Sequence, residues 1–162
     1  MRRSKHKITK RDLRKLLRLA GENIDSFFDR KPIYKKPYHG KVKLVALCQG
    51  AALHYIDGKN GVKDFDVWFF FPQKGGVILP YRRTGVADFG KSRFGKNPNK
   101  PLLDGRNVDV LMRSTKFFNR GNPRSCIIDY LTNCKTPSAK LLARKAVIGL
   151  YPESVFGKIL WP

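Results

Sequence analysis

Apolar residues recur at every third or fourth position in the first part of the chain. Leu13, Leu16 and Ala20 belong to such a series between residues 8 and 28. This period predicts an amphipathic helix, with Thr9 as a cap at its start. The opposite side of the helix is rich in Lys and Arg. That side is either a nucleic-acid contact or a solvated face.

The next part of the chain contains turn-forming segments between apolar ones. Residues 30–41 include two prolines, two tyrosines and a glycine, which predicts an extended connection instead of a second helix. The apolar run VKLVALC, residues 42–48, has the length of a strand, and residues 50–56 fit a short helix. After a turn rich in Asp, Asn and Gly comes the strongest strand pattern in the chain, DFDVWFFF, residues 64–71.

The second half of the chain predicts fewer strands and more helices. Residues 77–79 are expected to return beside the preceding strand as a hairpin. Residues 81–106 are poor in aliphatic side chains and predict an exposed loop with at most a short strand. The run NVDVLM, residues 107–112, reads as a strand, and helices are expected near 124–133 and 137–148.

These elements predict an α/β (α+β) fold in which a small mixed β-sheet is flanked by helices. The chain has 162 residues, of which 41% are hydrophobic, enough for one core and one domain. We expect a single domain over residues 1–162. Within it, residues 1–40 form a basic helix and linker, residues 42–112 the core, and residues 113–162 the C-terminal helices.

The charge of the chain changes the picture of its partners. Lys and Arg number 34 against 12 Asp and Glu, a formal net charge of +22. An anionic partner is therefore expected, with nucleic acid first and a membrane surface second. No apolar run approaches the roughly 18 residues that span a bilayer, and no apolar stretch follows the charged N-terminus. A cytoplasmic protein without a membrane partner is expected.

The cysteines support a reducing compartment. Cys48, Cys126 and Cys134 form no CxxC pair, and their odd number does not suit a complete disulfide framework. They also lack the spacing of zinc ligands relative to the three histidines. Ordinary buried thiols are the expected outcome.

Three aspartates carry the candidate chemistry. Asp64 and Asp66 are two apart in a predicted strand, so their side chains lie on one side of it. Two such carboxylates repel each other, and Mg²⁺ or Mn²⁺ would relieve that repulsion. Asp109 is flanked by valines in a later strand. If the strands are neighbours, the three converge on a site for one or two ions. The plain alternative for Asp64 and Asp66 is a solvated strand end.

The order of these motifs resembles the nucleotidyltransferase-fold superfamily, the DNA polymerase beta-like nucleotidyltransferases. Its signature is an apolar strand, Gly followed by Gly or Ser, a spacer and Asp-x-Asp. Here LCQGA is followed by Asp64-Phe65-Asp66, with Asp109 as the third carboxylate. The resemblance implies that these aspartates bind metal and that Gly50 and Ala51 contact the nucleotide. Ala51 replaces the usual Gly or Ser, so only the backbone can serve there, and the Arg that usually follows is missing.

A basic loop, residues 81–100, lies between the predicted strand that carries Asp64 and Asp66 and the one that carries Asp109. Its basic residues would contact phosphates, and its aromatic residues Tyr81, Phe89 and Phe94 could stack on bases of a single strand. The alternative is a solvated loop with Phe89 and Phe94 in the core. Asp88 is read as a turn residue in preference to a fourth acidic site residue. The expected nucleic-acid contacts are Arg82, Arg83, Lys91, Arg93 and Lys96.

Two function hypotheses follow. The first is a metal-dependent nucleotidyltransferase that moves a nucleoside monophosphate from a nucleoside triphosphate to RNA, to another polyanion or to a protein. The second is a module with the same fold that binds nucleic acid, RNA in preference to DNA, without performing chemistry. Toxin or antitoxin activity, with a protein or tRNA as acceptor, uses the same residue chemistry as the first hypothesis.

Overall fold

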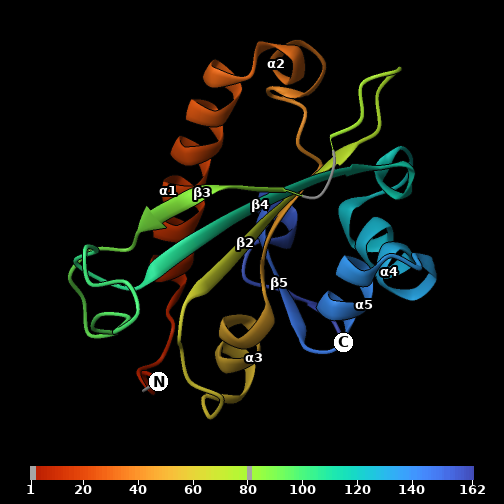
Figure 1. Cartoon of the computed structure of the whole chain (residues 1–162). Helices are drawn as coiled ribbons and strands as arrows, with labels where there is room; N and C mark the ends of the chain where they lie inside the picture. Colours follow the sequence, from red (N-terminus) through yellow and green to blue (C-terminus); the bar gives the residue numbers. More distant parts are fainter. Residues whose placement is uncertain (1–2, 80–81) are drawn as a thin grey trace.

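The computed structural model describes residues 3–79 and 82–162, and for Arg82 it describes only the backbone. The described residues form α-helices, two short 3-10 helices and one mixed sheet (Figure 1). The elements are α1 (Lys10–Arg30), α2 (Pro32–Tyr38), β1 (Leu44–Cys48), α3 (Gln49–Asp57), β2 (Phe65–Pro72), β3 (Arg82–Asp88), β4 (Asn107–Thr115), η1 (Lys116–Phe118), α4 (Pro123–Asn133), α5 (Pro137–Ala143), β5 (Ala146–Tyr151), η2 (Glu153–Val155) and β6 (Ile159–Trp161).

The sheet has six strands in the order β3-β4-β2-β1-β5-β6. Only β2 and β4 pair in parallel, and the remaining neighbours are antiparallel. The predicted mixed sheet flanked by helices is therefore confirmed as an α+β arrangement. None of the described helices is long and apolar enough to cross a membrane.

Strand alternation gives the sheet two different faces. On the closed face, Phe65, Val67, Phe69 and Phe71 of β2 are buried in a cluster that includes the apolar side of α1. On the open face, Trp68 and Phe70 of β2 pack in a second cluster with side chains of α4 and α5. Figure 1 shows α1 on one side of the sheet and α4 and α5 on the other. Asp66 lies on the open face, near the start of β2.

Several predicted elements are confirmed. The first helix begins directly after Thr9, whose hydroxyl accepts from Asp12 N while Asp12 returns a contact to the Thr9 backbone N–H, a capping box. The predicted strands at 42–48, 64–71 and 107–112 correspond to β1, β2 and β4, and the helices at 50–56 and 124–133 to α3 and α4.

The prediction of an extended connection over residues 30–41 is wrong, because α2 occupies most of it. Pro32 takes the first turn of α2, where its missing N–H has no cost. Pro37 comes in the last turn of this two-turn helix. The buried Tyr38 then anchors the helix, since its hydroxyl donates to Val77 O and lies 3.3 Å from Ser114 Oγ.

The hairpin predicted for residues 77–79 does not form. Both edges of β2 are already paired, with β1 and β4, and Val77 makes only an isolated bridge with Lys74. The segment predicted as a loop from residue 81 instead begins with the seven-residue edge strand β3. The helix predicted over 137–148 ends at Ala143, and β5 follows it.

Candidate functional site

The parallel pairing of β2 and β4 places two of the predicted site residues side by side. Asp66 and Asp109 are register partners, and Asp64 directly precedes β2. Asp109 is almost fully buried, while Asp64 and Asp66 are partly exposed. Carboxylates from separate parts of the chain therefore share one end of the open face, as the strand pattern predicted.

The three carboxylates do not form a ready metal shell. Within the described residues no three His, Cys, Asp or Glu side chains are grouped closely enough to hold a metal ion. Asp109 instead accepts from Asn107 Nδ2 at 3.2 Å and pairs with Arg83 Nη2 at 3.5 Å. Strand pairing brings Asp66 and Asp109 side by side. The binding of metal by all three carboxylates stays a prediction.

Asp66 has the most perturbed environment of the three. Burial, followed by the charges of Asp64 and Asp109, raises the pKa of Asp66 to about 7, against the opposing effect of Arg83 and Lys145. No hydrogen bond to Asp66 is found among the described residues. A buried carboxylate without a donor is stabilised by protonation or by a cation.

Asp64 lies in a similar environment. Burial and the charge of Asp109 raise the pKa of Asp64, and the nearby Lys63, Arg3 and Arg83 oppose that shift. Arg106 Nη1 donates to Lys63 O at 3.3 Å, and this contact holds the backbone directly before Asp64. The oxygens of Asp64 and Asp66 are hard, anionic ligands of the kind that Mg²⁺ and Mn²⁺ prefer. The residues present therefore fit a divalent cation.

A cavity of about 290 Å³ surrounds these two carboxylates. Its wall combines carboxylates with basic side chains drawn from four separate parts of the chain, so the cavity suits a ligand that carries both a cation and anionic oxygens. The basic residues are Arg3, Lys63, Arg83 and Lys145.

The start of α3 forms another part of the cavity wall. Gly50 and Ala51 line it, and no side chain caps the start of the helix. The methyl of Ala51 is buried in the closed-face core, which leaves only its backbone for a ligand. A Cβ at Gly50 would lie 3.0 Å from Asn60 Nδ2 and 3.3 Å from Arg3 Nη1. Glycine therefore lets the N-terminal segment approach the helix.

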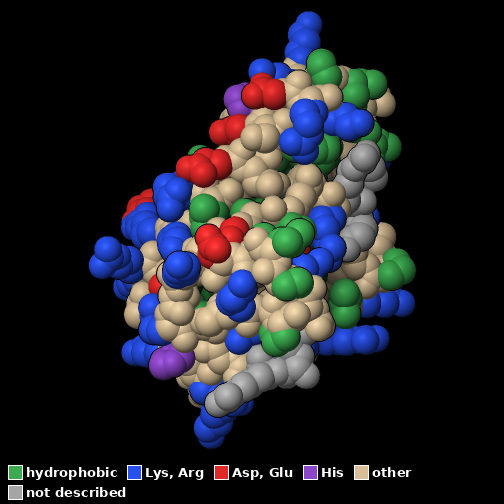
Figure 2. Space-filling model, turned by 60° about the vertical axis from the view of Figure 1, so that its left-hand side comes forward, with side chains coloured by type: hydrophobic (Ala, Val, Ile, Leu, Met, Phe, Trp, Pro, Cys, Tyr) green, Lys and Arg blue, Asp and Glu red, His purple; other side chains and the backbone are tan. Residues whose placement is uncertain are grey.

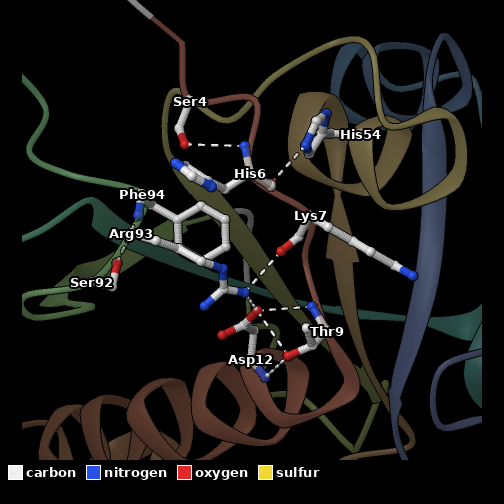
Figure 3. A network of polar contacts seen from close by, with 9 residues as sticks. All are labelled: Ser4, His6, Lys7, Thr9, Asp12, His54, Ser92, Arg93 and Phe94. Atoms are coloured by element: carbon white, nitrogen blue, oxygen red, sulfur yellow. Dashed lines mark hydrogen bonds and ion pairs between the residues drawn. The ribbon is translucent and has the colours of Figure 1, made fainter.

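That N-terminal segment is the main feature the sequence did not predict. Ser4 and Val62 exchange backbone hydrogen bonds of 2.9 and 2.7 Å, which holds Arg3 at the cavity. Figure 3 shows the contacts that fix the rest of the segment: Arg93 donates to Lys7 O and pairs with Asp12, and His54 contacts His6 O at 2.9 Å. No local pattern in residues 3–9 signals this docking. The sequence feature that fits this packing is Gly61, because any Cβ at that position would clash with Arg3.

Of the two alternatives for the basic loop, the structure agrees with the one that places Phe89 and Phe94 in the core. Phe89 and Phe94 are buried in the closed-face cluster, so they do not stack on nucleic-acid bases. Asp88 accepts from three backbone N–H groups and is a turn residue, as expected. Tyr81 and the side chain of Arg82 lie outside the described residues.

The remaining basic residues of the loop have separate environments. Arg83 pairs with Asp109 and Arg93 with Asp12, while both arginine side chains stay partly exposed. Lys96 Nζ donates to Pro101 O, and Lys91 is exposed. Lysines and arginines nevertheless cover much of the face drawn in Figure 2, where acidic side chains are few. The positive charge is therefore not confined to this loop, since Arg11, Arg14, Lys15 and Arg18 of α1 also line a surface groove.

Comparisons of the chain with protein-family models, with curated proteins and with solved structures found no match.

Proposed function

We propose that this chain is a divalent-metal-dependent nucleotidyltransferase. It moves a nucleoside monophosphate from a nucleoside triphosphate to an RNA, another polyanionic or a protein acceptor. The observation that carries the proposal is one cavity in which Asp64 and Asp66, without hydrogen-bond donors among the described residues, face four basic side chains and the uncapped start of α3. The motif order that resembles the nucleotidyltransferase-fold superfamily supports the same function.

The roles of the residues follow from their chemistry. Asp64 and Asp66 hold Mg²⁺ or Mn²⁺, which neutralises the charge on the phosphates as it develops. Arg3, Lys63 and Lys145 bind the phosphate oxygens, together with the backbone N–H groups at Gly50 and Ala51. These contacts position the α-phosphorus and exclude water from it.

Asp109 is assigned to the acceptor. Its carboxylate lies beside Asp66 and is oriented by Arg83 and Asn107, so it can hold the attacking hydroxyl and take its proton. The hydroxyl oxygen forms a bond to the α-phosphorus, the bond from that phosphorus to the bridging oxygen breaks, and pyrophosphate leaves.

A label-transfer assay tests the proposal. The protein is incubated with each α-³²P nucleoside triphosphate, Mg²⁺ or Mn²⁺ and total RNA, and label is followed on RNA and on the protein itself. Wild type should transfer label, and Asp64→Asn and Asp66→Asn should reduce transfer at least about a hundredfold, since each removes a charge that acts in the transition state. Asp129→Asn, at an exposed site on α4, is the matched control. Equal transfer by wild type and Asp66→Asn would refute the proposal.

The second candidate is an RNA-binding module without chemistry. It is favoured by the net charge of +22 and by a basic groove beside α1 that is lined by Arg11, Arg14, Lys15, Arg18 and Arg93. A cytoplasmic location suits an RNA partner. This candidate predicts RNA binding that falls steeply with salt, does not require Mg²⁺ and survives Asp66→Asn. Filter retention of RNA by both proteins, without label transfer, would favour it.

A further inference from the structure

A second cavity, of about 620 Å³, lies on the open face next to the carboxylate cavity. Trp68 and Leu141 line both, so the two cavities adjoin. The second one is bounded by β2 and β4 on one side and by the start of α5 on the other. Its volume is in the range of pockets that bind small molecules. Its central polar residue is Arg113 of β4.

Arg113 is held in place by uncharged groups. Its Nη1 donates to Tyr130 Oη at 3.1 Å, to Thr136 Oγ1 at 3.0 Å and to Ser138 Oγ at 2.6 Å, and the guanidinium lies 5.6 Å from the Tyr130 ring centroid. No carboxylate among the described residues pairs with it. Its Nε and Nη2 make no hydrogen bond to a described residue. The guanidinium thus offers two parallel donors in a fixed orientation.

The rest of the cavity wall is mainly apolar. Ile78, Leu79, Pro137 and Leu141 contribute to it. Bare phosphate would gain little from these side chains, whereas a flat heterocycle would bury its faces against them and present its edge to Arg113.

The position of Arg113 relative to the carboxylates fits a nucleotide. Arg113 follows Asp109 by four residues on the same strand and the same side of it, which places their Cα atoms about 13 Å apart. Phosphates bound at Asp64 and Asp66 would therefore lie at one end of the open face, with the ribose near Trp68 and the base at Arg113. The adjoining cavities provide that path.

We propose that the Arg113 cavity binds the base of the nucleoside triphosphate and selects guanine. Guanine presents two acceptors, O6 and N7, on one edge, and these match the two free donors of Arg113. Adenine presents an amino donor in place of O6, which would face a guanidinium N–H. The assignment rests on the proposed function, because it takes the phosphate end to lie at the carboxylates.

Monophosphates test the base pocket independently of transfer. Binding of GMP, AMP, CMP and UMP is measured by calorimetry on wild type, Arg113→Lys and Ile78→Trp. We expect wild type to bind GMP at least about tenfold more tightly than AMP, CMP or UMP. Arg113→Lys should lose the preference, since an ammonium offers no paired donors.

A second variant covers the case in which Arg113→Lys fails to fold. Ile78 is 56% exposed at the rim of the cavity, so Ile78→Trp fills the cavity without disturbing the core and should weaken GMP binding about tenfold. Ile56→Trp, at an exposed position on α3, is its control and should bind GMP as wild type does. Thermal melting of each variant establishes that it is folded.

The outcomes separate this inference from the proposed function. Equal affinity for the four monophosphates, no binding of any of them, or a GMP preference that survives both Arg113→Lys and Ile78→Trp overturns the guanine pocket. Label transfer from triphosphates can still be observed in each of those cases. Guanine-selective binding without label transfer supports the pocket and counts against the transferase.

Discussion

The two faces of the central sheet are built from the same strands and both bury aromatic side chains, but only the open face carries the candidate carboxylates. On the closed face, alternate residues of β2 are Phe65, Val67, Phe69 and Phe71, all buried beneath a helix. On the open face, the intervening positions begin with Asp66, whose pKa is raised to about 7. The comparison teaches that one face supplies the stability that allows the other to hold poorly solvated charge.

The largest effect on stability is expected from a charge placed on the closed face. Val67→Asp would bury a carboxylate that has no partner, and we expect it to lower the free energy of unfolding by more than about 4 kcal/mol. Urea denaturation followed by circular dichroism measures this loss. The control Ile128→Asp changes an exposed position on α4 and should cost less than about 1 kcal/mol. A Val67→Asp protein with the wild-type midpoint would contradict the comparison.

Removing the charge from the open face should have the opposite effect. Asp66 titrates near 3.8 when unfolded and near 7 when folded, so the folded state binds the extra proton between these values. The stability of wild type therefore falls as the pH rises from about 4 to 7. Asp66→Asn lacks this fall, and without divalent ions it should be more stable by about 2 to 4 kcal/mol at pH 8.

Denaturation at pH 4 and pH 8 with a chelator checks this sign. The two proteins should differ little at the lower pH, where Asp66 is protonated in the folded state and close to its unfolded pKa of 3.8. Added Mg²⁺ should raise the stability of wild type and leave the variant unchanged. Equal stability of the two proteins at pH 8 would show that folding does not raise the pKa of Asp66.

The contact between the N-terminal segment and the cavity can be weakened without substituting a residue on either face of the sheet. Gly61 has φ +80°, and a Cβ there would lie 2.8 Å from the Arg3 Cβ. Gly61→Ala should cost about 2 kcal/mol and weaken nucleotide binding, because Arg3 is displaced. Gly58→Ala is the matched control, since its φ is +65° but its Cβ would meet nothing within 4 Å. Equal nucleotide affinity in the two variants would show that Arg3 does not contribute to nucleotide binding.

The smallest expected effect concerns the surface outside both faces. Lys91 is exposed in the basic loop, so Lys91→Gln should change stability by less than about 0.5 kcal/mol. If the loop contacts RNA, the variant should lower the slope of log affinity against log salt by about one. Lys35→Gln on α2, whose ammonium pairs with Asp29, serves as the control. Identical slopes for wild type and both variants would exclude Lys91 from the RNA contact.

The sequence predicted the carboxylates better than the groups around them. The proximity of Asp66 and Asp109 could be predicted because each interrupts an apolar strand. Strand alternation then determines on which face of the sheet each side chain lies. Arg3 and Lys145 could not be predicted, since the first depends on the Ser4–Val62 bridge and the second on a strand that was read as helix. The run around Val147 is buried on both sides, and such runs carry no period that separates a strand from a helix.

The parallel pairing of β2 with β4 has a consequence for how the site comes into being. Asp66 and Asp109 belong to strands joined through the edge strand β3 and a long loop, so their meeting requires closure of a large segment of chain. Helix α1, by contrast, depends on contacts between near neighbours and can form early. The proposed catalytic site, with Asp109 beside the metal ligands, should therefore be complete only after this long-range pairing, and in a refolding experiment label transfer should lag behind helix formation.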